Sequence, residues 1–243
     1  MTPDVGAPGR QVPVRASPMS TSQELTLVTG FLTVIGLSWR WHAGAHGFCP
    51  GIDIVDGVLL IAPDARASAA LHEAGHLATL PGEFRPYAQR NVSGVQRLIC
   101  EHVDFAEEPD GDLQRAAIQC SDPEATAWAW AAGQHLGLPP KAIIQDDEYD
   151  GDGAFVRLQL ATRGYLGING LAHAGFCAQR PNAYAKARGL PAFPELRFWL
   201  QRNFGTPIVG SSSRHGAGLP SAGVRRSAPR DRGLINAASA NVQ

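Results

Sequence analysis

The segment His72-Glu73-Ala74-Gly75-His76 combines two imidazoles and a carboxylate within five residues. In an α-helix, residues four apart are related by about 400° of rotation and about 6 Å of rise, so His72 and His76 project from one face and can bind one metal ion. Glu73 lies about 100° further around the helix, beside that ion. This pattern predicts a zinc site at which Glu73 is the general base for an attacking water molecule.

The elements around this segment must hold it as a helix. We expect a helix from Ala65 to Leu80, because Asp64 can cap its start and Pro81-Gly82 follows its end. Gly75 lowers the helix propensity by about 1 kcal/mol relative to alanine. That cost is tolerable if the missing side chain lets a neighbouring element pack closely.

A β-hairpin is predicted directly before this helix. The segments 52–55 and 58–61 are mainly β-branched or aliphatic, and Asp56-Gly57 between them favours the positive φ angles of a tight turn. An earlier helix is expected within residues 21–37, where apolar residues recur at helical spacing. The sequence therefore predicts an α+β fold with a small sheet packed on the motif helix.

A hairpin followed by a helix bearing HEAGH resembles the zincin metallopeptidases. The preceding helix and the compact size are most similar to the small bacterial zincins of the IrrE type, over residues 24–140. The resemblance implies a zincin-like fold, a Zn²⁺ cofactor, and a protein or peptide substrate that pairs with an edge strand. It also implies hydrolysis of peptide bonds by a metal-activated water, with Glu73 as the general base.

Two histidines hold zinc weakly, so a third protein ligand is expected. A metzincin would carry a further histidine where this chain has Gly82, which excludes that class. The segment 121–131 is similar to the downstream helix of glutamate-type zincins, which makes Glu124 the leading candidate. Glu124 also matches a capping box with Ser121, in which its carboxylate would bind the helix N-terminus instead. The alternative ligands are Asp122, Glu101, His102 and Asp104.

Tyr165 and His173 are candidate transition-state stabilisers, because their side chains can donate hydrogen bonds to a developing oxyanion. The alternative for both is structural, as a buried tyrosine and a hydrogen-bonded core histidine. Helical spacing over residues 155–165 predicts a helix there, and a short closing helix is expected over residues 194–201.

Acidic residues gather in two stretches, 101–112 and 146–152, which we interpret as solvated loops. The second stretch imitates a calcium loop. Its twelfth position is Arg157, where such a loop needs a bidentate glutamate, so calcium is excluded.

Composition places strong limits on function. The formal net charge of the 243 residues is −1, which excludes binding to nucleic acid or to an anionic membrane through overall charge. Segments 1–20 and 203–243 are rich in small, polar and proline residues and are predicted to be disordered, with residues 21–202 as one domain. The arginines of the C-terminal segment are expected to belong to a solvated tail.

Four cysteines without a C-x-x-C pair are typical of reduced thiols in the cytoplasm. The apolar run 25–39 loosely imitates a signal peptide, but Glu24 abuts it and Trp39 and Trp41 crowd the cleavage region. The run is also too short and threonine-rich for a membrane span. We therefore expect a cytoplasmic protein with neither a membrane nor a specific nucleic-acid partner.

The leading functional hypothesis is a zinc-dependent peptidase. The alternative is a non-catalytic zincin-like domain with a regulatory or partner-binding role that retains the metal site. Both share every metal ligand, so a substitution of Glu73 is needed to separate them. The sequence identifies neither the substrate nor the oligomeric state.

Overall fold

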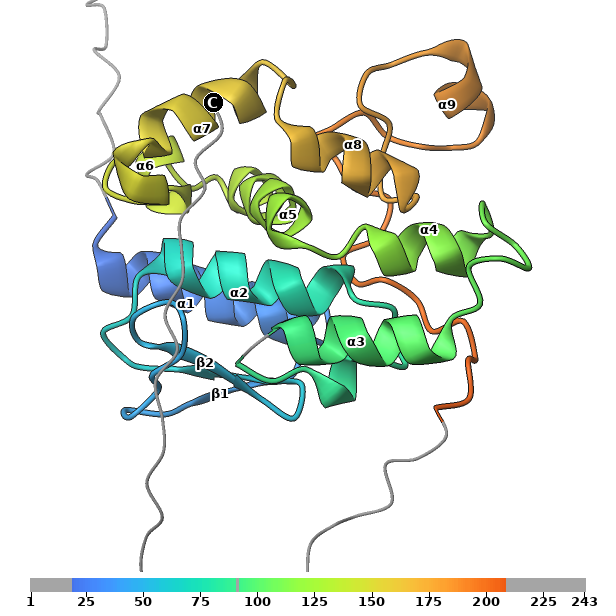
Figure 1. Cartoon of the computed structure of the whole chain (residues 1–243). Coiled ribbons are helices and arrows are strands. Elements are labelled where there is room, and N and C mark those ends of the chain that lie inside the picture. The colour runs from blue at the N-terminus through green and yellow to red at the C-terminus, as the bar shows by residue number, and fades with distance from the viewer. Residues whose placement is uncertain (1–18, 91, 209–243) are drawn as a thin grey trace, which may run out of the picture. The chain divides into compact units, whose positions relative to one another are not determined.

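The computed structural model describes residues 19–208 except residue 91. Most of the two segments predicted to be disordered, including the tail arginines, lies outside these described residues. The described part has an α+β fold in which the helices stack on one side of a small mixed sheet, as predicted at the level of fold class (Figure 1). None of its helices is long and apolar enough to cross a bilayer.

The elements follow one another along the chain with short connections. The helices of the described residues are α1 (Thr21–Val34), α2 (Ala67–Thr79), α3 (Val92–His102), α4 (Asp112–Ile118), α5 (Asp122–His135), α6 (Pro140–Ile143), α7 (Gly153–Ala161), α8 (Leu166–His173) and α9 (Ala183–Ala187). Two 3₁₀ turns cover Arg85–Tyr87 and Tyr149–Gly151.

The sheet contains β1 (Trp39–Trp41), β2 (Ile52–Val55) and β3 (Val58–Ile61) in the order β1-β3-β2. Strands β2 and β3 form the predicted antiparallel hairpin, and β1 runs parallel to β3. The turn residues Asp56 and Gly57 both have positive φ angles, of 49° and 72°. The hairpin prediction is therefore confirmed in position and in turn chemistry.

Helix α2 lies at the centre of the packing. Helix α1 and the sheet cover one side of it, and α5 and α6 pack on the other (Figure 1). Every residue of α2 is buried except His72, which is partly exposed. A helix of alanine and leucine fits this position because small side chains allow neighbours on all sides.

Close approach between α2 and α5 depends on Gly75. A Cβ atom added at Gly75 would lie 2.5 Å from the carbonyl oxygen of Ala125 and 2.9 Å from its Cα. The expectation that this glycine admits a neighbour is confirmed. Helix α8 approaches α5 in the same way, since Gly167 lies against the Pro123 carbonyl and Gly170 against the Glu124 side chain.

Helix boundaries differ from the predictions at several points. Helix α1 is capped by Ser20, whose hydroxyl oxygen accepts a hydrogen bond from the Gln23 N–H at 3.3 Å. The helix predicted over 155–165 is α7, which ends four residues earlier at Ala161, and Tyr165 is instead the N-cap of α8.

The predicted closing helix over residues 194–201 is wrong. Backbone groups of this segment bond to other elements instead of to one another. The Arg197 N–H donates to the Phe176 carbonyl at 2.7 Å, and the Gln201 N–H donates to the Ala78 carbonyl at 2.8 Å. The Trp199 carbonyl accepts from the indole of Trp128 at 2.9 Å. Tertiary hydrogen bonds therefore replace the helical ones.

Candidate metal centre

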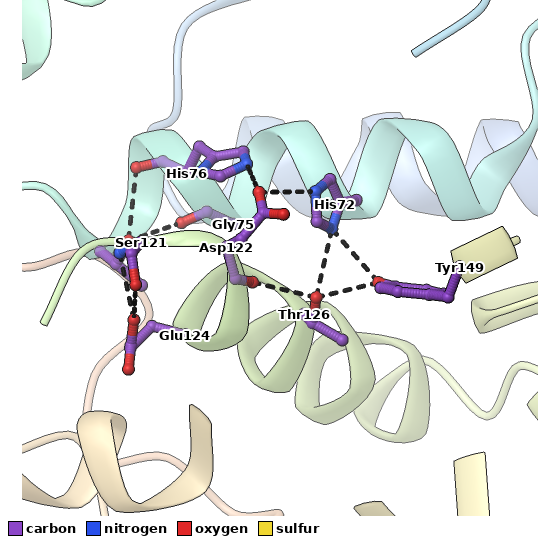
Figure 2. A network of polar contacts seen from close by, with 9 residues as sticks. His72, Gly75, His76, Ser121, Asp122, Glu124, Thr126 and Tyr149 are labelled. Atoms are coloured by element: carbon purple, nitrogen blue, oxygen red, sulfur yellow. Dashed lines mark hydrogen bonds and ion pairs between the residues drawn. The ribbon is translucent and has the colours of Figure 1, made fainter. Parts of the chain in front are cut away.

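Three side chains from two helices converge at the HExxH motif. Asp122 begins α5 and directs its carboxylate at both imidazoles of α2 (Figure 2). Its Oδ1 atom lies 3.1 Å from His76 Nε2 and 3.6 Å from His72 Nε2. The His76 and His72 side chains are 6% and 14% exposed, whereas that of Asp122 is 72% exposed. The group therefore opens to solvent on the Asp122 side.

The spacing of these donors fits a tetrahedral zinc site. Zinc bonds of about 2.0–2.1 Å to nitrogen and oxygen place neighbouring ligand atoms about 3.3 Å apart. The 3.1 and 3.6 Å separations lie on either side of that value, and one donor atom from each residue falls within 4.8 Å of the others. The 3.6 Å separation between Asp122 Oδ1 and His72 Nε2 is too long for a hydrogen bond. A direct hydrogen bond therefore accounts only for the contact between Asp122 and His76.

The hydroxyl groups of Thr126 and Tyr149 orient the His72 ring. Its Nδ1 atom lies 3.5 Å from the Thr126 hydroxyl and 3.4 Å from the Tyr149 hydroxyl, which are themselves 2.9 Å apart (Figure 2). Thr126 also donates to the Asp122 carbonyl at 3.0 Å. These contacts keep Nδ1 turned away and Nε2 toward Asp122, which is the arrangement that supports a metal-binding histidine.

His76 has a different environment. Its Nδ1 atom is buried and has no hydrogen-bond partner within the described part of the chain. The polar contact of this ring is therefore made through Nε2, on the side that faces Asp122.

Glu124 does not lie at the imidazoles. Its Oε2 atom accepts hydrogen bonds from the Ser121 N–H at 3.1 Å and from the Ser121 hydroxyl at 2.6 Å (Figure 2). The structure therefore brings Asp122, and not the predicted Glu124, to the two imidazoles. The physical reason is that the first turn of a helix has unpaired N–H groups, and a glutamate at its third position reaches back to them.

The other alternative ligands also lie apart from the cluster. Asp104 accepts hydrogen bonds from the N–H groups of Ala106 and Glu107, and His102 Nδ1 is 2.9 Å from the Leu98 carbonyl. Neither these residues nor Glu101 belongs to the group formed by His72, His76 and Asp122.

Glu73 is 6% exposed and faces the loop that carries Cys49. Burial raises the pKa of the Cys49 thiol, and the nearby Glu73 carboxylate, which accepts a hydrogen bond from that thiol, raises it further. Glu73 therefore lies on a different side of α2 from the face on which His72 and His76 meet Asp122.

A cavity of about 760 Å³ opens beside the three donors. His72 and Asp122 form part of its wall, and Ile143 and Ile144 contribute apolar surface. Cys49 also lines it, so the Glu73 side of the helix borders the same space.

The two candidate stabilisers are separated by the length of α8. Tyr165, at the start of the helix, lies near Thr126, and its pKa is raised mainly by burial and also by the Asp122 and Glu124 charges. His173 ends the helix, with its Nε2 atom 3.5 Å from Asp110. The structure therefore places Tyr165 near Thr126, on the side of the candidate centre, and His173 beside Asp110, at the other end of α8.

Sequence reasoning missed Thr126 and Tyr149. Tyr149 belongs to the acidic stretch interpreted as a solvated loop, yet it has a φ angle of 58° and its ring packs near His72. The neighbouring Glu148 anchors this loop through a 2.6 Å hydrogen bond from the Ser68 hydroxyl. Positive φ at a tyrosine is rare and marks a backbone held by its surroundings.

Comparison with known proteins adds no relative to this description. No family model, no characterised protein and no solved structure matches the chain. The function of the centre is therefore inferred from the donor atoms, their spacing and the cavity beside them.

Proposed function

We propose that this chain is a zinc-dependent peptidase with a zincin-like fold. The observation that carries the proposal is the convergence of His72 Nε2 and His76 Nε2 on Asp122 Oδ1, at separations suited to one tetrahedral ion. The HExxH helix beneath a small sheet supports the zincin-like assignment of the fold.

His72, His76 and Asp122 are the residues that would hold the ion. Zinc, when bound, supplies a Lewis acid and a water molecule of lowered pKa. Thr126 and Tyr149 keep the His72 ring in its binding orientation.

Glu73 is the proposed general base. Its carboxylate takes a proton from the attacking water and later delivers it to the leaving nitrogen of the peptide bond. Tyr165 is retained as the candidate donor to the oxyanion, because it shares Thr126 with the His72 network. The substrate is proposed to be a protein or peptide segment that lies in the cavity lined by His72 and Asp122.

Metal content tests the ligand set. The purified full chain is expected to hold near-stoichiometric zinc, and Asp122→Asn is expected to lose most of it. Glu124→Gln is the matched variant from the same helical turn and is expected to keep zinc while losing about 1 kcal/mol of stability from the helix cap. Zinc loss in Glu124→Gln with full retention in Asp122→Asn would reverse the assignment.

Activity tests the peptidase. With a quenched fluorescent peptide library as substrate, Glu73→Gln is expected to keep zinc and to lose about 10²- to 10⁴-fold in hydrolysis, because only the proton-transfer group changes. Glu83→Gln is a control outside the metal-binding group. A zinc-loaded wild-type chain that cleaves no member of the library would contradict the peptidase and favour the non-catalytic alternative.

A further inference from the structure

A second cavity lies at the C-terminal end of α8, away from the metal centre. Its volume is about 460 Å³, and it is bordered by parts of α4, α8, α9 and the segment 197–204 (Figure 1). His173, which is excluded from the metal centre by its position, forms part of its wall. We call it the arginine cavity after the residues that give it its charge, Arg115, Arg188, Arg197 and Arg202.

Two carboxylates in the wall offset part of this charge. Asp112 pairs with both Arg115 and Arg202, and the latter contact is 2.6 Å long. Asp110 lies 3.6 Å from Arg115 and 3.5 Å from His173. Each aspartate is therefore already shared between two partners, and the wall keeps two formal positive charges with His173 neutral.

Arg188 and Arg197 carry the remaining positive charge. Neither forms an ion pair with a carboxylate of the described residues. The Arg188 guanidinium lies 5.3 Å from the centre of the Tyr184 ring and donates to its hydroxyl at 2.5 Å, so its position is defined. The backbone of Arg197 is fixed by its hydrogen bond to the Phe176 carbonyl.

Aromatic rings form another part of the wall. Tyr184, Phe198 and Phe204 all line the cavity, and Arg202 packs over the Phe204 ring at 4.6 Å. A guanidinium binds phosphate or carboxylate oxygens through paired N–H groups, and a neighbouring aromatic surface favours a planar apolar group. The wall thus offers one surface for an anion and one for a ring.

From this arrangement we infer that the arginine cavity binds a small aromatic or heteroaromatic anion bearing a phosphate-like group. Arg188 and Arg197 bind the anionic oxygens, and Tyr184, Phe198 and Phe204 contact the ring. This site is separate from the proposed zinc centre, and its occupation requires neither zinc nor hydrolysis.

Calorimetric titration of the chelator-treated full chain with phenylphosphonate tests the inference. We expect saturable binding that weakens as salt is added, and at least tenfold weaker binding of inorganic phosphate, which lacks the ring. Arg188→Gln and Arg197→Gln are each expected to weaken phenylphosphonate binding about tenfold, since each removes a charged donor. Arg97→Gln, an exposed arginine on α3, is the matched control and should bind as the wild type does.

Three results with the wild type and the arginine variants would overturn the inference. They are the absence of saturable binding at millimolar phenylphosphonate, equal affinities for phenylphosphonate and inorganic phosphate, and unchanged binding in both arginine variants. Phosphonates also bind zinc, so the titration is repeated with His72→Ala/His76→Ala. Retained affinity in this variant supports the arginine cavity, whereas lost affinity would assign the binding to the metal centre. Circular dichroism of each variant confirms that it is folded.

Discussion

Substitution of Gly75 by alanine tests the close packing of α2 against α5, which brings the candidate metal donors together. The new Cβ atom would lie 2.5 Å from the Ala125 carbonyl oxygen, whereas ordinary contacts begin at 3.4 Å. Backbone atoms on both sides cannot rotate away, so α5 must recede by about 0.9 Å at this point. Asp122 lies one turn before Ala125 and moves with it.

Two effects on stability oppose each other in Gly75→Ala. Alanine improves helix propensity by about 1 kcal/mol, and overpacking in a core costs about 1–3 kcal/mol. Because the clash is with backbone, we take the upper part of that range and expect a net loss of about 1–2 kcal/mol. Widening of the 3.1 Å contact between Asp122 and His76 should also weaken zinc binding by about tenfold or more.

Urea unfolding of the chelated protein and zinc titration against a competing chelator measure the two effects. Gly30→Ala is the control, because Gly30 lies in α1 with no atom within 4 Å of its added Cβ. This control is expected to gain about 0.5–1 kcal/mol and to leave zinc affinity unchanged. If Gly75→Ala were stabilising to the same extent and bound zinc normally, the account of α2 and α5 packing would be refuted.

Further predictions concern the environment of individual side chains. Thr126→Val is expected to lower zinc affinity about 10- to 100-fold in a chelator competition, since it removes a partner of His72 Nδ1, whereas Thr162→Val, which loses only a bond within its helix, should not. A hydrogen bond from Arg90 holds the pKa of Asp53 below its usual value, so its stabilising effect is complete above the unfolded-state pKa of about 3.9 and lost as the pH falls through the lower folded-state value. The stability advantage of the wild type over Asp53→Asn in urea unfolding should therefore shrink with acidification, and an advantage that grows would contradict the pairing. Burial raises the pKa of Cys120 and of Cys177 to about 12, whereas Cys100 is exposed. A thiol reagent at mild alkaline pH should accordingly show one fast-reacting group, which Cys100→Ser removes.

Local patterns in the sequence predicted the parts of the fold that depend on local chemistry. The hairpin turn needs positive φ at Asp56-Gly57, and the motif helix needs only its own periodicity, so both were predicted to within two residues. The predicted cap Asp64 is wrong, because the N-cap of α2 is Arg66, which forms no side-chain capping bond. The sequence also suggested why α2 contains Gly75, namely that its missing side chain lets a neighbouring element pack closely. The helix predicted over residues 194–201 is wrong because the backbone of this segment forms hydrogen bonds with elements distant in the chain. No local sequence pattern indicates such bonds.

At the candidate site, too, local sequence patterns could not decide which of Asp122 and Glu124 lies at the histidines. The two residues lie two positions apart in one helical turn, and the resemblance favoured the glutamate over the aspartate. Two contacts decide between them: Glu124 caps the helix through Ser121, and the close approach of α2 to α5 at Gly75 and Ala125 brings Asp122 to the histidines. Thr126 and Tyr149 could be identified as partners of His72 only from this crossing and from the loop that follows α6.

The three candidate metal donors come from two helices that are far apart along the chain. His72 and His76 belong to α2 and Asp122 to α5, so an ion held by all three closes a loop formed by residues 77–121. A bound ion would therefore act as a removable cross-link. It would stabilise the folded chain by about 4 kcal/mol when the concentration of free metal is a thousand times the dissociation constant of the site. Helices α3 and α4 lie within the closed loop. Substitutions or proteolytic nicks there would therefore be better tolerated in the metal-loaded chain than in the metal-free one.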